Sequence, residues 1–362
     1  MWRSDSPVLE INLAKLQSNT FRVVEKCREL GISVLGVTKG FSAIPEIVAA
    51  MAAGGVDGLA DSRMENIIEM RADGFRQPMT LLRIPCLSDV KSVIAYATTS
   101  LNSELSVIRA LAQAAEQQGK THQIVLMVDV GDLREGVLPH DVLNTVREIM
   151  RLKGVALVGI GTNMGCLGGI LPEIKNLGML THLGAMIEAQ LGLHMDIISG
   201  GGTSTLQLVE HKAVPPKINQ LRIGEGILLG TDTTHNWIIP WLAQDAFRIR
   251  VEVIEVKAKP SLPTGTIGRD GFGHVPNFED IGIRNRAIVA IGKQDVYVEG
   301  LIPVNKKINI VGASSDHLVV DITDSEREIQ VGDAIEFSPT YSGLLLACRS
   351  NYITKVFKEG PV

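Results

Sequence analysis

Short apolar runs alternate with helix-like segments along the first two thirds of the chain. The helix-like segments repeat apolar residues every three or four positions, as in 45–55, 64–74, 103–119 and 138–154, and many of them end in glycine. The apolar runs have the length of buried strands, and eight are expected: 33–39, 57–61, 79–84, 99–102, 123–130, 156–163, 195–201 and 219–224.

Eight strands that alternate with helices over about residues 33–230 imply a parallel sheet. That number within about 200 residues predicts a closed (β/α)8 TIM-like barrel. A doubly wound open sheet is the main rival. Its dinucleotide-binding version is disfavoured because no GxGxxG motif follows the first predicted strand.

The pattern changes near Phe247. Alternating and β-branched runs with little helical periodicity then predict a C-terminal all-β domain, with strands expected at 247–258, 287–292, 307–313, 318–323 and 334–339. We therefore predict a barrel over residues 1–240 and a β domain over 241–362, joined through the segment 231–245. Residues 7–13 precede the barrel and are a candidate strand to pair with the β domain.

Composition narrows the possible partners. The chain has 362 residues, enough for two domains, and a net charge of −5, which argues against nucleic acid or an anionic membrane as a partner. No apolar run has the length of a membrane span, and no signal peptide is recognisable. The four scattered cysteines and the unclustered histidines predict neither disulfides nor a metal site, so we expect a cytoplasmic protein.

Polar residues at the ends of the predicted strands are the candidates for chemistry, because barrel enzymes place their sites there. Lys39 follows the first apolar run, and a surface lysine is the ordinary explanation for such a residue. If it is partly desolvated at the barrel mouth, its pKa falls and its amine becomes nucleophilic. Such an amine forms Schiff bases with carbonyl compounds, including pyridoxal phosphate.

The stretch SGGGTS, residues 199–204, follows the seventh strand. Gly201 and Gly202 permit a close backbone approach, while Thr203 and Ser204 offer hydroxyls and a helix N-cap. A flexible turn is the alternative, but a late phosphate site is a recurrent feature of this fold. Arg222, on the eighth strand, either pairs with Glu225 or faces a pyridine nitrogen and keeps it unprotonated.

Together these residues resemble the alanine-racemase family of pyridoxal-phosphate enzymes, and within it the racemases of ornithine and related amino acids. The resemblance covers almost the whole chain and rests on several stretches: VLEINLAKLQSNT, VTKG, LADSR, LLRIP, VDVGDLREG, SGGGTS, LRIGEGILLG, IGKQDV and VGASSDHLVVDI. It implies that Lys39 holds pyridoxal 5'-phosphate covalently and that Arg222 faces its pyridine nitrogen.

The resemblance also implies the remaining contacts. The phosphate would be held by Gly201, Gly202, Thr203 and Ser204, helped by backbone groups of Gly224 and Glu225. Arg134 would lie near the cofactor's phenolic oxygen and the substrate carboxylate. A head-to-tail homodimer would share its active sites, with the β domain of one subunit completing the site of the other.

Three departures from alanine racemases bear on the substrate. The stretch after Lys39 is GFSAIP and lacks the family tyrosine, Asn163 stands where a histidine is usual, and Gly292-Lys293-Gln294-Asp295 replaces Gly-Tyr-Ala-Asp. The opposite-face base is therefore open: Lys293 and Tyr341 are candidates, Asp295, Asp316 and His317 are further alternatives, and each can equally be a satisfied polar group of a β domain. Asp295, Ser315 and Asp316 are candidate substrate contacts beside Arg134.

These features predict a two-base racemase that interconverts L- and D-amino acids, with ornithine or another basic amino acid as substrate. A racemase of alanine, of serine or of broad specificity is the alternative within the class. Outside it, we consider a non-catalytic pyridoxal-phosphate-binding protein, which would lack the β domain. A decarboxylase would carry a paired-histidine motif, and a metal-assisted aldolase would need clustered ligands; neither feature is present in the sequence.

Overall fold

A closed eight-stranded parallel barrel forms the core of the first part of the molecule. In the computed structural model, which describes residues 6–360, the barrel strands are β2 (Ser33–Val37), β3 (Gly58–Asp61), β4 (Met79–Leu81), β5 (Thr99–Asn102), β6 (His122–Met127), β7 (Val155–Gly161), β8 (Ile197–Ser199) and β9 (Gln220–Ile223). The barrel closes where β9 pairs with β2, with Arg222 opposite Leu35. The predicted barrel is confirmed, and the open-sheet rival is wrong.

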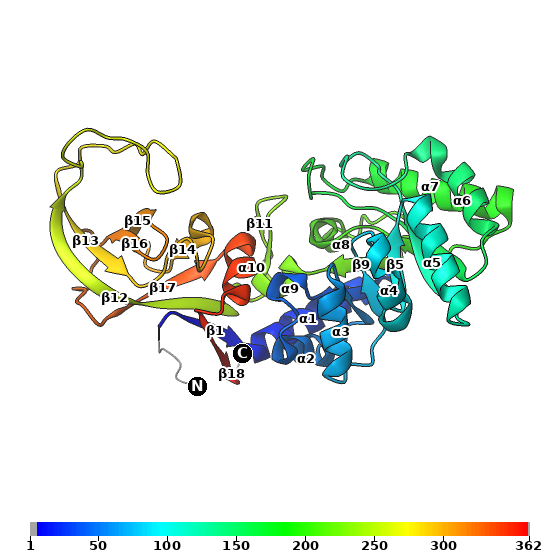
Figure 1. Ribbon diagram of the computed structural model, residues 1–362, viewed down its shortest axis with the longest axis horizontal. Helices are drawn as coiled ribbons and strands as arrows, with labels where there is room; N and C mark the ends of the chain where they lie inside the picture. The colour runs from blue at the N-terminus through cyan, green and yellow to red at the C-terminus, as the bar shows by residue number, and fades with distance from the viewer. Residues whose placement is uncertain (1–5, 361–362) are drawn as a thin grey trace. The chain divides into compact units, whose positions relative to one another are not determined.

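One helix precedes the first barrel strand, and each barrel strand is followed by a further helix (Figure 1). They are α1 (Leu13–Arg28), α2 (Pro45–Ala53), α3 (Met64–Ala72), α4 (Val90–Tyr96), α5 (Leu105–Gln117), α6 (Val142–Met150), α7 (Ile174–Leu191), α8 (Leu206–Glu210) and α9 (Glu225–Leu229). Each longer helix turns an apolar stripe to the barrel; in α5, for example, Val107, Ile108, Leu111 and Ala115 are buried. A short hairpin of β10 (Thr231–Asp232) and β11 (Trp237–Ile238) follows α9.

The C-terminal part is built on an eight-stranded sheet. Its strands are β1 (Val8–Asn12), β12 (Phe247–Pro260), β13 (Ile283–Val289), β14 (Leu301–Pro303), β15 (Asn309–Ala313), β16 (Leu318–Asp321), β17 (Ala334–Pro339) and β18 (Thr354–Lys358). β1 pairs antiparallel with β12 and parallel with β18, and its Leu9 and Ile11 are fully buried. The predicted β class is confirmed, but α10 (Tyr341–Arg349) is a helix that the sequence pattern did not predict.

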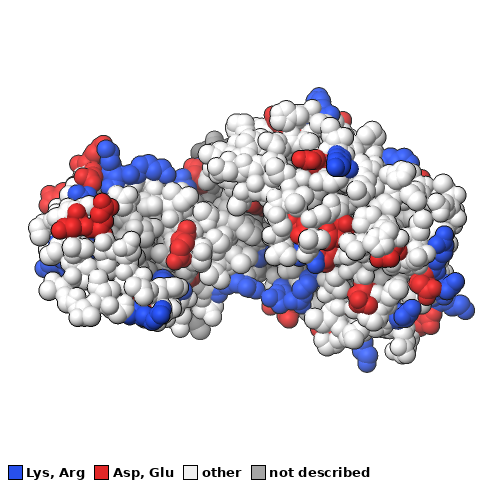
Figure 2. All heavy atoms as spheres, turned by 90° about the horizontal axis from the view of Figure 1, so that it is seen from above, with Lys and Arg blue, Asp and Glu red and all other residues white. Residues whose placement is uncertain are grey.

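By their internal contacts, the described residues divide into two compact units. Residues 13–244 form one unit, and residues 6–12 with 245–360 form the other. Within residues 6–360 no helix combines the length and apolar character needed to span a membrane. On the face shown in Figure 2, acidic and basic side chains are interspersed rather than sorted by sign.

Candidate active site

Lys39 lies just beyond the end of the first barrel strand. The strand β2 ends at Val37, so Lys39 begins a 3-10 turn, Lys39–Phe41, and is not the last strand residue that the sequence suggested. Thr38 ties this turn to β3, because its N–H donates to the Ala60 carbonyl (2.9 Å) and its hydroxyl to Asp61 (2.6 Å). The backbone then passes through two left-handed residues, at 42 and 43, with φ of 53° and 51°. Such strain is common where a functional side chain must be held in place.

The charge state of Lys39 depends on its surroundings. Burial lowers the pKa of its ammonium group most, and the cations Arg134 and Arg222 lower it further. Cys166 and Asp61 act in the opposite direction. Because the net pKa shift is downward, a larger fraction of the amine is neutral and nucleophilic than for an exposed lysine.

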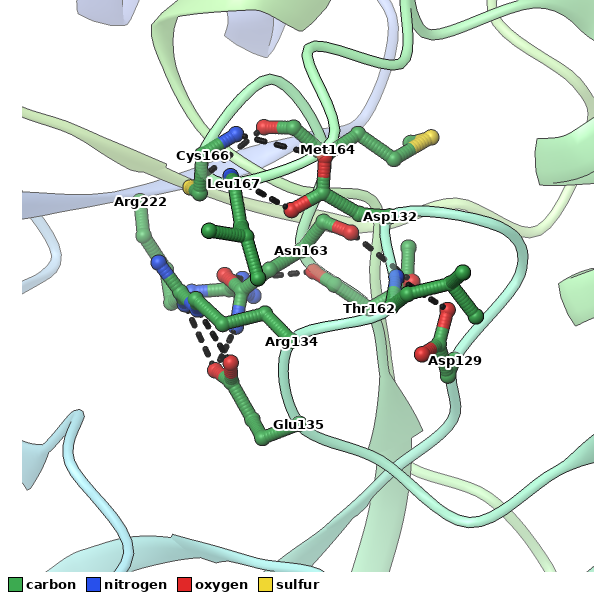
Figure 3. Close-up of polar contacts among 11 residues, drawn as sticks. Asp129, Asp132, Arg134, Glu135, Thr162, Asn163, Met164, Cys166, Leu167 and Arg222 are labelled. Carbon is green, nitrogen blue, oxygen red and sulfur yellow. Dashed lines mark hydrogen bonds and ion pairs between the residues drawn. The ribbon is translucent and has the colours of Figure 1, made fainter.

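Arg222 projects from β9 and is almost fully buried, with 5% of its surface exposed. Its NH2 group donates to the Thr162 carbonyl (2.6 Å) and to Asn163 Oδ1 (2.7 Å) (Figure 3). Its NH1 group donates to the Ser199 hydroxyl. Burial lowers the pKa of Arg222 to about 10, so the guanidinium remains a cation at neutral pH.

The alternative partner of Arg222, Glu225, is occupied elsewhere. Its carboxylate accepts hydrogen bonds from the Thr231 hydroxyl (2.9 Å), the Thr233 N–H (2.9 Å) and the Thr233 hydroxyl (2.6 Å). Burial raises the pKa of Glu225. An ion pair between Arg222 and Glu225 is therefore absent among the described side chains, and Glu225 instead holds the β10–β11 hairpin.

Arg134 lies in the loop after β6. It forms a two-point ion pair with the neighbouring Glu135, through Nε and through NH2 (2.6 Å to Oε1). This pairing raises the pKa of Arg134. Since Arg134 also lowers the pKa of Lys39 and of Arg222, the fold brings the three predicted cations into one electrostatic cluster.

The stretch after β8 forms a glycine-lined turn. Gly201 has φ of 101°, which favours glycine, and its carbonyl accepts the Arg222 N–H (3.0 Å). Thr203 and Ser204 lie in a 3-10 turn, Thr203–Thr205, while Thr205 takes the N-cap position of α8; the predicted N-cap role for the first two is wrong. The Gly226 N–H donates to Thr203 Oγ1 (3.1 Å), which leaves the hydroxyl proton of Thr203 for another acceptor.

These features fit pyridoxal phosphate in three respects. Lys39 supplies a buried amine with a lowered pKa for the carbonyl. Arg222 is a cation held in place by Thr162 and Asn163, and it would be available to a ring nitrogen. Gly201 and Thr203 would offer a turn for the phosphate, and Gly202 packs closely on the barrel there, since a Cβ at this position would lie 3.2 Å from the Arg222 carbonyl.

Candidate residues of the second unit gather on two adjoining turns. The Lys293 N–H donates to the Ser314 carbonyl (3.0 Å), and the Lys293 ammonium lies 4.2 Å from the centroid of the Phe272 ring. Asp316 accepts from the Ser315 hydroxyl (3.2 Å). Asp295 accepts the Gly292 N–H (2.9 Å), and burial raises its pKa, with Asp316 adding to the effect. Tyr341 is the first residue of α10.

Three side chains of the barrel site were not predicted: Asp61, Glu135 and Ser199. Asp61 ends the strand in LADSR and Glu135 follows Arg134 in VDVGDLREG, so both lie inside stretches that carried the family resemblance. The position of Asp61 and Ser199 at strand ends was a usable signal, whereas Glu135 lies in the loop after β6. Among the described residues, no group of three or more histidine, cysteine, aspartate or glutamate side chains is placed to hold a metal ion.

Comparisons of the sequence and of the fold with known proteins lead to amino-acid racemases. Residues 11–232 match the family described as "Alanine racemase, N-terminal domain". The chain is 41% identical to a lysine racemase of Thermotoga maritima, covering 97% of this chain and 98% of the relative. It is 39% identical to an ornithine racemase of Acetoanaerobium sticklandii, covering 96% and 99%. The crystal structure of alanine racemase from D-cycloserine-producing Streptomyces lavendulae has the same fold, with a TM-score of 0.78, 18% identity and 99% of both chains covered.

Proposed function

Because the chain belongs to the alanine racemase family, we propose that it is a pyridoxal-phosphate-dependent racemase of basic amino acids. The observation that carries the substrate class is similarity over nearly the whole length to a lysine racemase and an ornithine racemase. The observation that carries the chemistry is the buried Lys39 amine, with its lowered pKa, beside Arg134 and Arg222.

The proposed roles follow from what each side chain can do. When bound, pyridoxal phosphate supplies a carbonyl that condenses with amines and a ring that acidifies the substrate's Cα proton. Lys39 attaches the cofactor and moves the Cα proton on one face of the substrate. Arg222 donates to the ring nitrogen without giving up its own proton, since its pKa of about 10 is well above neutral.

Binding is assigned to the remaining groups. The hydroxyls of Thr203 and Ser204, the backbone of Gly201 and Gly202, and the backbone N–H groups of residues 224 and 225 hold the phosphate. Arg134 binds the substrate carboxylate, because a guanidinium pairs with that planar group through parallel hydrogen bonds.

We assign the opposite-face base to the second unit, with Lys293 and Tyr341 as candidates and Asp295, Ser315 and Asp316 as substrate contacts. The support is the clustering of four of these five residues on adjoining turns. A head-to-tail homodimer would bring this cluster to the partner's barrel. The four unpaired cysteines support a reducing compartment, and hence the cytoplasm.

Replacement of Lys39 tests the proposal. Lys39→Ala is expected to lose both the visible absorbance of the bound cofactor and racemisation of lysine and ornithine. Lys91→Ala, which removes an exposed lysine of α4, is the control and is expected to retain both. Retention of either property at the wild-type level by Lys39→Ala would contradict the proposal.

A substrate panel tests the specificity. Exchange of the Cα proton in heavy water is measured for ornithine, lysine, arginine, serine and alanine. Preference for the basic amino acids is expected. Preference for alanine or serine would overturn the substrate class, and bound cofactor without any exchange would favour a non-catalytic binding protein.

A further inference from the structure

Glu135 contacts two groups of the site at once. One carboxylate oxygen, Oε1, accepts from Arg134 NH2 (2.6 Å) and from Asn163 Nδ2, while Oε2 accepts from Arg134 Nε. Figure 3 shows Glu135 reaching toward both partners, with the contacts drawn as dashed lines. Only 16% of the Glu135 side chain is exposed, so these bonds are largely shielded from water.

The contact with Asn163 determines how its amide points. Nδ2 donates to Glu135, so Oδ1 is left to accept from Arg222 NH2 at 2.7 Å. A reversed amide would place Nδ2 against the guanidinium and Oδ1 against the carboxylate, which gives two repulsive contacts. Glu135 therefore orients the acceptor that faces Arg222.

The contact with Arg134 determines which edge of its guanidinium is available. Glu135 occupies Nε and one hydrogen of NH2. The NH1 group makes no hydrogen bond with the residues that the structure describes, and 38% of the Arg134 side chain is exposed. One edge of the guanidinium is thus held by the protein, and another is left for a ligand.

Charge balance supports the same role. The cations Arg134 and Arg222 each lower the pKa of Lys39, and Arg134 also lowers that of Arg222. Glu135 has the opposite effect on the two arginines, because its carboxylate raises the pKa of Arg134 and of Arg222. Its carboxylate reduces the repulsion among cations gathered at one end of the barrel.

We propose that Glu135 is a positioning residue of this site: it holds Arg134 with NH1 directed to the substrate carboxylate, and it orients Asn163 to receive Arg222. The proposal rests on the proposed racemase function. This role differs from the stabilisation of loops. In the same loop, Asp132 is the residue that stabilises the loops. That carboxylate accepts the N–H groups of residues 166, 167 and 170 and so joins the loop after β6 to the loop after β7.

The variant Glu135→Gln tests this role, because its amide nitrogen cannot accept a hydrogen bond. Calorimetry on the cofactor-loaded protein compares lysine with pentane-1,5-diamine, which has the same amines but no carboxylate. We expect the Kd of lysine to rise about tenfold and that of the diamine to change less than about twofold. The KM of lysine should rise in parallel.

Asp132→Asn is the matched control, since it loosens the same pair of loops without removing a hydrogen bond to either arginine; its carboxylate acts on Arg134 only through space. It is expected to lower the Tm and to change the ratio of the two Kd values far less than Glu135→Gln does. A Glu135→Gln protein that behaves like wild type, or that weakens both ligands equally, would overturn the positioning role. Glu135→Asp, which keeps the charge but shortens its reach, should give an intermediate Kd and serves if Glu135→Gln does not fold.

The link to Arg222 is tested with Asn163→Ala. If Glu135 acts on Arg222 through Asn163, the loss in kcat caused by Glu135→Gln should be smaller in the Asn163→Ala background than in wild type. Additive losses would contradict the link. Wild-type protein without racemase activity would refute the proposed function itself, whereas an active wild type with an unselective Glu135→Gln variant refutes only the role of Glu135.

Discussion

At the scale of single residues, the setting of Lys39 depends on buried polar groups beneath it. Asp61 is fully buried and accepts from the Thr38 hydroxyl (2.6 Å), the Arg63 N–H (2.8 Å) and Asn66 Nδ2 (3.0 Å). A buried carboxylate is tolerated only when hydrogen bonds replace its lost hydration. These bonds anchor the turn that carries Lys39 to the end of β3.

Thr38→Val tests this anchor, because valine has the same shape but no hydroxyl. We expect the free energy of unfolding in urea to fall by about 1.5–3 kcal/mol, the range for a hydrogen bond to a charged group. Thr20→Val is the control: Thr20 is equally buried, but its hydroxyl donates to the neutral Leu16 carbonyl (2.7 Å). Thr20→Val should lower the free energy of unfolding by less than about 1 kcal/mol. Equal losses in the two variants would argue against the anchoring role of the bond between Thr38 and Asp61.

At the scale of elements, strand β6 begins with a buried histidine. His122 has 4% of its surface exposed, and its Nε2 lies 2.9 Å from the Ser100 hydroxyl on β5. Burial lowers the pKa of His122 from 6.5 to about 4, so the ring is neutral in the folded barrel. Between these two pH values the unfolded chain binds a proton that the folded chain does not.

Barrel stability should therefore depend on pH through this residue. The free energy of unfolding is expected to be unaffected by His122 above pH 6.5 and to fall as the pH drops toward about 4. The total loss should be about 3 kcal/mol. His122→Gln should remove this part of the pH dependence, while the exposed His140→Gln should not. Urea unfolding at several pH values measures the free energy of unfolding. If its dependence on pH were the same in His122→Gln as in wild type, His122 would not be the group responsible.

At the scale of the whole molecule, the N-terminal strand belongs to the C-terminal unit. β1 lies between β12 and β18, so the chain enters the second unit before it builds the barrel. The candidate opposite-face residues lie in that unit, while Lys39 lies in the barrel. In a head-to-tail dimer, each complete site would therefore need residues of both subunits.

Subunit mixing tests this sharing. Lys39→Ala and Lys293→Ala proteins are first assayed alone, and each is expected to be inactive. After reassortment, half of the dimers are mixed and each mixed dimer has one intact site, so about a quarter of wild-type activity should return. If Lys293→Ala is active by itself, Tyr341→Phe takes its place in the mixing experiment. If neither variant restores activity when mixed with Lys39→Ala, the sites are not shared between subunits.

Much of this architecture was already determined by the order of residues. Apolar runs separated by helical repeats predict a parallel barrel, because each run is long enough for one buried strand and each repeat for one covering helix. Parallel closure brings the carboxyl ends of all strands together, which is why Lys39, Arg134 and Arg222 could be assigned to one site. The helix α10 escaped this approach because its apolar residues, in YSGLLLACR, form one continuous run rather than a repeat every three or four positions.

The tertiary structure alone decided how those residues are paired. The bonds Thr38–Asp61, Glu135–Asn163 and Asn163–Arg222 join residues 23, 28 and 59 positions apart. A local pattern reports which face of a strand is buried, but it contains no information about which loop end meets another. That choice depends on barrel closure and side-chain packing: the pair with Glu225, considered as the alternative for Arg222, is not formed, and Arg222 instead contacts Thr162, Asn163 and Ser199.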